Sequence, residues 1–160
     1  MIELNRLAPE QAQQRLFACF ASLRWARQVA AGRPYADLAA LLAAAERAFS
    51  ELEPADWEEA LAGHPRIGEH GGSSPIASER EQGGVRSASA PTLDQLAVEN
   101  RHYEARFGHV FLIAAAGKGA EEILAALRER LSNDPVTEAG VAAAEHRKIA
   151  RQRLKAMFPA

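Results

Sequence analysis

The amino-acid composition predicts an all-α fold. The 160 residues include 35 Ala and 16 Leu, whereas Val, Ile and Thr together number 14. Ala and Leu have high helix propensities, and β-branched residues are the ones that pleated sheets favour. A chain of this length matches one domain, so we expect a single domain over residues 1–160, built as a bundle of seven or eight helices.

Four helices are expected in the first part of the chain. Pro9 suits the first turn of a helix that extends to about residue 20, because its missing N–H costs nothing there. Ser22 can cap a second helix that reaches residue 29. The fourth helix begins at Pro54 and ends at Gly63. The third carries a one-sided apolar stripe, made of Leu38, Leu41, Leu42, Ala45 and Phe49.

The second part of the chain begins with a glycine- and proline-rich loop. This loop covers Gly63–Pro91 and holds one short helix around Ser78–Gln82. Thr92 is expected to cap a long helix that stops at Gly108. The apolar run 110–116 is too short to be assigned from its periodicity, so it is either extended or the start of a buried turn. Two further helices follow, over residues 120–131 and from Pro135 to about Met157.

The charge balance excludes several classes of protein. Lys and Arg number 19 against 21 Asp and Glu, a formal net charge of −2, so the basic surplus that binds nucleic-acid phosphates is lacking. No apolar run approaches the roughly 18 residues of a membrane span, and the N-terminal residues do not resemble a secretory signal. Cys19 is the only cysteine, which excludes an internal disulfide. We therefore expect a cytoplasmic protein without a nucleic-acid or membrane partner.

His64 is the first candidate for a catalytic residue. It follows the predicted end of the fourth helix and precedes Pro65, which restricts the turn. A histidine held in this way can face a cavity, and the ordinary pKa of an imidazole suits proton transfer near neutral pH. A histidine on a surface loop is the alternative interpretation.

A second group of candidates lies on the short helix within the loop. Ser78, Glu81 and Gln82 are spaced i, i+3 and i+4, so a helix places them on one face. That face offers a hydroxyl, a carboxylate and an amide, which together can bind a polar ring. The alternative is a solvated face, like the one that Glu79 and Arg80 are expected to form.

Arg153 is the third candidate because of its position in the last helix. At about 100° per residue, Arg153 falls within an inward stripe, whereas Arg151 and Lys155 fall outside it. A guanidinium that faces a core must meet a carboxylate or an anionic ligand, since an unpaired buried charge is costly. The alternatives are a structural ion pair or a stem that reaches the helix end. The stripe consists of Ala139, Ala142, Ala143, His146, Ile149, Ala150 and Met157.

The sequence predicts no metal or cofactor site. His64 and His70 are isolated, and Glu99 with His102 makes up only half of the paired motif of a di-iron bundle. None of the three lysines lies in an apolar setting that would suit a Schiff base. We therefore expect neither a metal ion nor an organic cofactor.

Several of these residues belong to motifs that follow one another along the chain. The motifs are His64-Pro65-Arg66-Ile67-Gly68, Ser78-x-x-Glu81-Gln82, Tyr103 with Arg106-Phe107-Gly108, Phe111-Leu112-Ile113, and Glu145 with Lys148-Ile149 and Arg153-Leu154. Together with Arg33-Pro34-Tyr35, they resemble the OHCU decarboxylase family over nearly the whole chain. Enzymes of this family act on 2-oxo-4-hydroxy-4-carboxy-5-ureidoimidazoline (OHCU), the last intermediate of urate oxidation.

The resemblance implies an all-helical protein, usually a homodimer, that needs no metal or organic cofactor. It implies decarboxylation of OHCU to (S)-allantoin and CO2, with a proton added to one face of the substrate. The catalytic residues would be His64, Glu81 and Arg153, the last of which also binds the substrate. The substrate-binding residues would be Pro65, Ser78, Gln82 and the backbone of Phe111, Leu112, Ile113, Ala114 and Ala115.

The residue types suit this chemistry. Loss of CO2 leaves an electron pair on carbon, which the C=N bond of the substrate can accept. The protein then has to bind an anion, orient the substrate and supply a proton. We expect Arg153 to hold an anionic or carbonyl part of the substrate. His64 and Glu81 would engage the hydroxyl and carboxylate region, with His64 carrying the proton.

Two alternatives to this function stay open. The same fold could act on a related ureido or carboxylated heterocycle, or the chain could be a non-catalytic helical module that binds a partner through the loop. A binding module has no need of an inward arginine such as Arg153 or of polar side chains near a loop histidine. His109, which follows the Arg106-Phe107-Gly108 motif, is expected to pack rather than to line the pocket.

Overall fold

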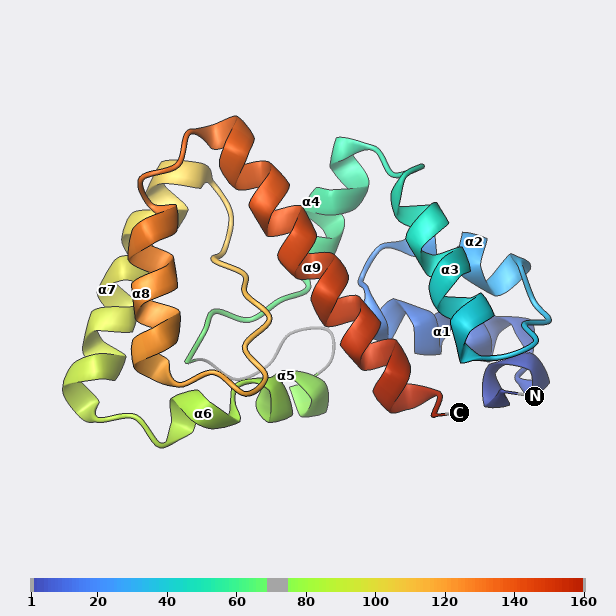
Figure 1. Cartoon of the computed structure of the whole chain (residues 1–160). Coiled ribbons are helices and arrows are strands. Elements are labelled where there is room, and N and C mark those ends of the chain that lie inside the picture. The colour runs from blue at the N-terminus through green and yellow to red at the C-terminus, as the bar shows by residue number, and fades with distance from the viewer. Residues whose placement is uncertain (1, 69–74, 160) are drawn as a thin grey trace. The chain divides into compact units, whose positions relative to one another are not determined.

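The fold is made of helices. The computed structural model describes residues 2–68 and 75–159, and in these ranges it contains nine α-helices, one short 3-10 helix and no β-strand (Figure 1). The all-α prediction is confirmed. The helix beyond the expected seven or eight is α6 (Gly83–Arg86), whose two consecutive glycines are typical of a loop.

The chain forms two compact units. The first comprises Met1–Leu61 and Arg147–Ala160, and the second comprises Ala62–His146. Helix α9 (Pro135–Met157) therefore contributes its N-terminal part to the second unit and its C-terminal part to the first. Each unit has its own apolar core. The single domain expected over residues 1–160 stays a prediction.

The helices of the first unit begin where the sequence predicts. Pro9 opens α1, and the Oγ atom of Ser22 caps α2 by accepting a hydrogen bond from the backbone N of Trp25 at 3.3 Å. The elements are η1 (Glu3–Arg6), α1 (Pro9–Cys19), α2 (Leu23–Ala31), α3 (Leu38–Phe49) and all but the last residue of α4 (Pro54–Ala62).

Four aromatic rings form the centre of the first unit. The Phe20 ring lies edge-on to Phe49 at 5.0 Å and to Trp57 at 5.3 Å, measured between centroids. Trp25 stacks on Phe49 at 5.3 Å, and its indole Nε1 donates a hydrogen bond to the carbonyl of Ala45 at 3.1 Å. The indole N–H is thus satisfied within an otherwise apolar core, as a buried tryptophan requires.

The second unit is built around α7 and α8, which pack side by side (Figure 1). Its core includes Leu96 and Tyr103 from α7 and Ile123 and Leu127 from α8, all almost inaccessible to solvent. The helices are α5 (Pro75–Glu81), α6 (Gly83–Arg86), α7 (Ala90–Phe107), α8 (Ala120–Arg130) and the start of α9.

Helix α7 begins earlier than predicted. Its N-cap is Ser89, whose Oγ accepts a hydrogen bond from the backbone N of Thr92 at 3.4 Å, so the assignment of Thr92 as the cap is wrong. Pro91 does not prevent this start, because backbone N–H groups in the first helical turn have no partner within the helix. The helix stops at Gly108, as predicted, with a φ angle of 77° that glycine adopts without strain.

The segment after α7 runs as a long irregular stretch of chain, and residues 110–115 are called the extended segment below (Figure 1). Residues 110–115 belong to no helix or strand, and a turn follows at 116–117. Side chains from helices satisfy part of its backbone: Arg130 donates to the carbonyl of Leu112 at 2.6 Å, and Glu145 accepts from the backbone N of Ala114 at 2.8 Å. These contacts explain how an apolar run can be buried without a neighbouring strand.

Within residues 2–68 and 75–159, no helix is both long enough and apolar enough to cross a lipid bilayer.

Candidate active site

His64 lies just after α4 and is buried. The residue is only 9% exposed to solvent, although it occupies a loop. The Nε2 atom of His64 is 2.7 Å from the Nε2 atom of His146 on α9, and the two rings meet edge-to-face with their centroids 4.5 Å apart. The surface-loop interpretation of His64 is therefore wrong, since the ring is enclosed and hydrogen-bonded.

The residues after His64 are held by two amide side chains. The Oε1 atom of Gln82 accepts a hydrogen bond from the backbone N of Gly68 at 2.8 Å. The Nδ2 atom of Asn100 on α7 donates to the carbonyl of Ile67 at 3.3 Å. The His64–Gly68 motif is thus tied to Gln82, which lies between α5 and α6, and to Asn100 of α7.

The face formed by Ser78, Glu81 and Gln82 is turned inward. Ser78 and Gln82 are buried and Glu81 is half-buried, whereas Glu79 and Arg80 are exposed. The side chains exposed to solvent are thus those of Glu79 and Arg80, which the helical spacing places on the opposite face from the candidates. Burial of a hydroxyl and an amide side by side gives this face the polar groups that a small ligand can bind.

The extended segment supplies backbone groups close to α9. Phe111, Leu112, Ile113, Ala114 and Ala115 are all buried. The backbone N of Ala114 is bonded to Glu145, and the next residue on α9 is His146, the partner of His64. One turn of α9 therefore contacts both the predicted catalytic histidine and the predicted backbone lining.

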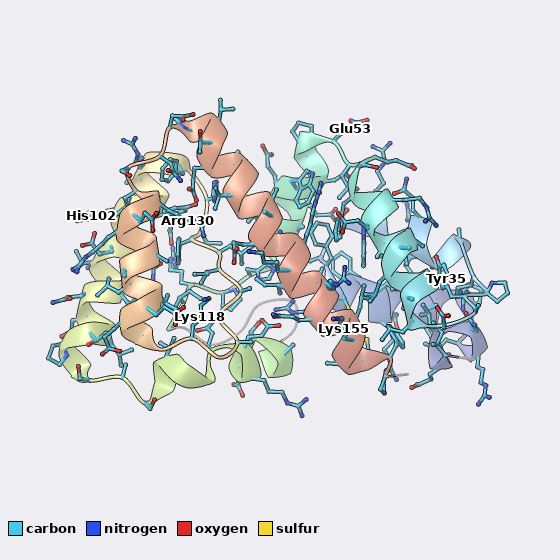
Figure 2. All side chains as sticks on the ribbon, viewed as in Figure 1. Tyr35, Glu53, His102, Lys118, Arg130 and Lys155 are labelled. Carbon is cyan, nitrogen blue, oxygen red and sulfur yellow. The ribbon has the colours of Figure 1, made fainter. Side chains whose placement is uncertain are left out.

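A buried ionic network holds the other side of the extended segment. Arg130, which Figure 2 labels on α8, donates from Nε to the Glu138 carboxylate at 2.8 Å and from Nη1 to the carbonyl of Leu112. The Tyr103 hydroxyl donates a hydrogen bond to the same carboxylate, and Asn133 Nδ2 donates to its second oxygen at 2.8 Å. Because each oxygen of the carboxylate has a donor, the charge pair is satisfied within the core.

This network shifts the pKa of two of its members. Burial alone would raise the pKa of Glu138, but hydrogen bonds from Arg130, Tyr103 and Asn133 outweigh it and lower the pKa below its ordinary value. Burial, together with the hydrogen bond to Glu138, raises the pKa of the Tyr103 hydroxyl. Both groups therefore keep their usual charge states at neutral pH, which favours a structural role for the network.

Arg153 lies in the first unit. It is only 5% exposed, as its position in the inward stripe predicts, and its Nη1 atom donates to the carbonyl of Ala18 at 3.4 Å. The prediction that the inward stripe begins at Ala139 is wrong, because Ala139 is exposed and the preceding residue, Glu138, is buried instead. The pairing of Glu138 with Arg130 allows a charged residue to replace an apolar one there.

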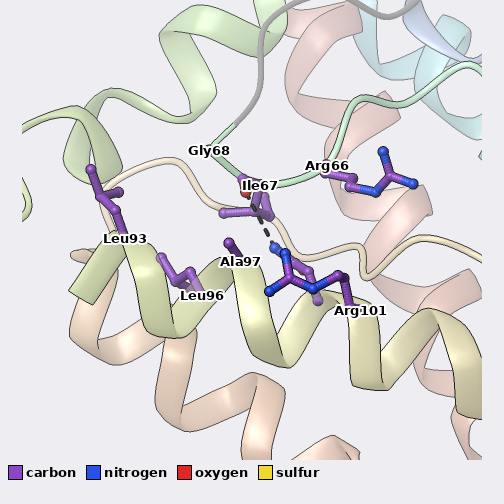
Figure 3. A pocket seen from close by; sticks show the side chains of 8 residues that line it. Arg66, Ile67, Gly68, Leu93, Leu96, Ala97 and Arg101 are labelled. Carbon is purple, nitrogen blue, oxygen red and sulfur yellow. Dashed lines mark hydrogen bonds between the residues drawn. The ribbon is translucent and has the colours of Figure 1, made fainter. Parts of the chain in front are cut away.

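A cavity of about 390 Å³ lies beside the His64–Gly68 motif (Figure 3). The loop Arg66–Gly68 forms one wall, and Leu93, Leu96, Ala97 and Arg101 of α7 form the other. Of the residues that the structure describes, none of the predicted site residues lines this cavity. The candidate site is therefore defined by hydrogen-bonded groups around His64 and the extended segment.

Two of the residues considered for metal binding, Glu99 and His102, contact each other, whereas His70 lies outside the residues that the structure describes. His102 and Glu99 form an exposed pair at 3.2 Å, and Arg128 also contacts Glu99. Hydrogen bonding to His102, followed by that to Arg128, lowers the pKa of Glu99. In the part of the chain that the structure describes, no cluster of His, Cys, Asp or Glu side chains could hold a metal ion. His109 packs with its ring 5.5 Å from that of Tyr103.

Sequence reasoning did not single out His146, Glu138 and Arg130. His146 could have been predicted by the same argument as Arg153, because both are polar residues within the stripe of the last helix that is expected to face inward. Glu138 and Arg130 gave no such signal, since each lies near a helix end, where charged residues are common.

Comparison with known proteins decides the family. The model of the OHCU decarboxylase family matches residues 5–155, which is almost the whole chain. The chain belongs to the OHCU decarboxylase family. It is 32% identical over 135 residues to the 2-oxo-4-hydroxy-4-carboxy-5-ureidoimidazoline decarboxylase of Amia calva, covering 81% of this chain and 77% of that protein.

Longer relatives show the same similarity. The chain is 32% identical to the uric acid degradation bifunctional protein TTL of Arabidopsis thaliana over 95% of its own length, and 30% identical to the bifunctional protein PucL of Bacillus subtilis over 96%. It spans 49% of the first of these proteins and 32% of the second. The chain thus spans half or less of these bifunctional relatives.

Two solved structures share the fold of this chain. A crystal structure of OHCU decarboxylase in the presence of (S)-allantoin superposes with a TM-score of 0.81 at 30% identity, covering 92% of this chain and 99% of that one. A crystal structure of (S)-allantoin synthase, 20% identical, superposes with a TM-score of 0.72 over 97% of this chain and 52% of that one. The all-α architecture of the family member described here is that of its relatives.

Proposed function

We propose that this chain decarboxylates OHCU to (S)-allantoin and CO2 in urate degradation, without a cofactor. The observation that carries the proposal is the enclosed His64 at the head of the family motif, hydrogen-bonded to His146 and followed by a loop that Gln82 holds. A buried imidazole with fixed partners is a suitable proton carrier, since it is held in one orientation and its ring nitrogens can both donate and accept a proton.

The reaction needs little from the protein beyond orientation and a proton. When the bond to the carboxylate carbon breaks, CO2 leaves and the electron pair forms a double bond between the two ring carbons, while the C=N electrons move onto the ring nitrogen, which takes up a proton. The carbon that lost the carboxylate then becomes a carbonyl as its hydroxyl loses a proton, and a proton adds to one face of the neighbouring, ureido-bearing carbon, giving (S)-allantoin. The gain in rate comes from holding the substrate where a single donor reaches one face.

We assign the roles as follows. His64 carries the proton, and Glu81 engages the hydroxyl and carboxylate region with it. Ser78 and Gln82 bind the ring, the latter through its amide N–H groups because its Oε1 already accepts from Gly68. Arg153 binds an anionic or carbonyl part of the substrate, an assignment supported by its match to the family motif and its burial. Pro65 and the buried backbone of residues 111–115 line the site.

The decisive experiment generates OHCU in place from urate with the two preceding enzymes and follows its decay by circular dichroism. We expect wild-type protein to give optically pure (S)-allantoin, and His64→Ala to reduce kcat by about 10²–10⁴-fold, the usual contribution of a general acid or base. His102→Ala, which removes an exposed histidine of α7, is the matched control and should keep wild-type activity. Decay no faster than in the absence of protein, with racemic product, would overturn the proposal.

The same assay tests the anion-binding role of Arg153. We expect Arg153→Gln to reduce kcat/KM by about 10–150-fold, which corresponds to the loss of a hydrogen bond to a charged group. Arg151→Gln, on the exposed face of the same helix, is the control and should behave like wild type. Equal activity of the two variants would remove Arg153 from the site.

We further propose that residues 1–160 act as one decarboxylase domain in a cytoplasmic homodimer. The match of one family model to residues 5–155 supports the single domain, and the family resemblance supports the dimer. The single cysteine is consistent with a reducing compartment. Sedimentation equilibrium would measure the mass in solution, and a monomer at micromolar concentration would contradict the dimer.

A further inference from the structure

We propose that His146 is a positioning residue that fixes the ring orientation and the tautomer of His64. The proposal rests on the proposed function, because it assigns to His146 a role in the proton transfer of His64. It goes beyond that function, since His146 belongs to none of the motifs that carry the family resemblance.

The geometry of the pair carries the proposal. The two Nε2 atoms are 2.7 Å apart, which is the length of a strong hydrogen bond, and the rings stand at 78° to each other. His146 is fully buried and His64 is nearly so. A buried hydrogen bond of this kind holds both rings, since breaking it would leave polar atoms without compensation from water.

The chemistry of the imidazole then limits the protonation states that the pair can adopt. A hydrogen bond between two Nε2 atoms contains a single proton, so one ring donates and the other accepts. The tautomer of each neutral ring follows from that choice, and two protonated rings would direct N–H groups at each other. The pair therefore holds at most one positive charge while the bond is intact, and His64 exchanges its proton within this constraint.

Helix α9 supplies the rigidity. The residue before His146, Glu145, accepts a hydrogen bond from the backbone N of Ala114 at 2.8 Å. The same helical turn thus contacts the predicted substrate-lining segment and the ring that holds His64. A histidine placed on a helix in this way orients a functional partner more precisely than a residue on a loop would.

Three variants separate orientation from packing. In His146→Gln, the amide can replace the Nε2 atom and keep the hydrogen bond, whereas in His146→Leu the volume is similar but the hydrogen bond is lost. We expect His146→Leu to lower kcat by about 10–100-fold, as for other groups that orient a functional histidine, with KM changed less than about threefold. His146→Gln should restore kcat to within about threefold of wild type. His102→Gln is the control on an exposed face and should have no effect.

A measurement independent of activity accompanies the kinetics. Long-range ¹H–¹⁵N spectra of the imidazole rings report their tautomers, and the chain has only five histidines to assign. We expect His64 to show one tautomer in wild type and in His146→Gln, and an exchanging mixture in His146→Leu. If His146→Leu does not fold, His146→Asn replaces it, because the shorter amide cannot reach His64.

The outcomes distinguish this inference from the proposed function. A wild-type protein without decarboxylase activity overturns the proposed function, while the ring spectra still decide whether His146 fixes the tautomer of His64. An active wild type together with a His146→Leu variant whose kcat lies within twofold of wild type, or whose His64 signals are unchanged, overturns the inference alone.

Discussion

Two arginine side chains are buried among the residues that the structure describes, Arg130 and Arg153. Arg130 neutralises Glu138 and at the same time binds the carbonyl of Leu112, so it couples an ion pair to the position of the extended segment. Its guanidinium also lies over the Phe111 ring at 4.6 Å. A planar fork with several donors can satisfy all these partners together, which a lysine could not do.

The charge of Glu138 should matter both for stability and for its pH dependence. We expect Glu138→Gln to lower the free energy of unfolding by about 3–5 kcal/mol at pH 7, because Arg130 is left buried without a counter-charge. Urea denaturation followed by circular dichroism measures this effect. Glu129→Gln, on the exposed face of α8, is the matched control and should change stability little.

The sign of the pH effect follows from the lowered pKa of Glu138. A carboxyl whose pKa is lowered by folding stabilises the native state at any pH above its ordinary pKa of 4.5. This stabilisation is lost as the pH falls below 4.5 and through the lower pKa of the folded protein. The difference in stability between wild type and Glu138→Gln should therefore narrow below pH 4.5. A difference that stays constant down to acid unfolding would contradict the ionic role of Glu138.

At the scale of elements, the short helix α6 packs directly on the turn before α8. A Cβ atom built on Gly84 would lie 2.1 Å from the carbonyl oxygen of Lys118, whereas a Cβ atom on Gly83 would meet nothing within 4 Å. The close approach of two backbones explains why glycine is needed at residue 84. It also explains why α6 forms although its glycines are poor helix formers, since packing outweighs propensity here.

This difference between neighbours gives a sharp test. We expect Gly84→Ala to lower the free energy of unfolding by about 1–3 kcal/mol, because the backbone of Lys118 has to move. Gly83→Ala should be neutral or stabilising by up to about 1 kcal/mol, since alanine favours the helix and nothing opposes it. Thermal and urea unfolding of both variants provide the comparison. Equal effects would show that α6 does not pack on this turn.

At the scale of the whole molecule, one helix contributes to both compact units. Helix α9 extends from Pro135 to Met157 and passes from the second unit to the first between His146 and Arg147. A helix forms cooperatively along its length, so loss of one unit should destabilise the other. This reasoning favours a single cooperative unfolding transition despite the division into two units.

The positions of the tryptophans allow the cooperativity to be measured. Both tryptophans, Trp25 and Trp57, belong to the first unit, whereas far-ultraviolet circular dichroism reports the helices of both units. We expect the urea midpoints from tryptophan fluorescence and from circular dichroism to coincide, as two-state unfolding requires. Midpoints that differ beyond error would mean that the units unfold separately and would contradict the single domain proposed for residues 1–160.

Local sequence alone predicts the all-α class, the start of α1 at Pro9, the cap of α2 at Ser22 and the end of α7 at Gly108, because helix propensity and capping act over a few residues. The same short range limited the prediction of two other helix positions. The start of α7 after Ser89 depended on whether Pro91 lay in the first turn of a helix or in a loop. The existence of α6 depended in the same way on whether Gly83 and Gly84 were helical, and local composition decides neither question.

The hydrogen bonds that hold the candidate site together depend on tertiary packing. His64 and His146 are 82 residues apart in the chain, Gly68 and Gln82 are 14 apart, and Ala114 and Glu145 are 31 apart. Motif order indicates which residues belong to the family site, but it carries no information about such hydrogen bonds. They form because buried polar groups must find partners, and the packing of distant elements determines which partners lie within reach.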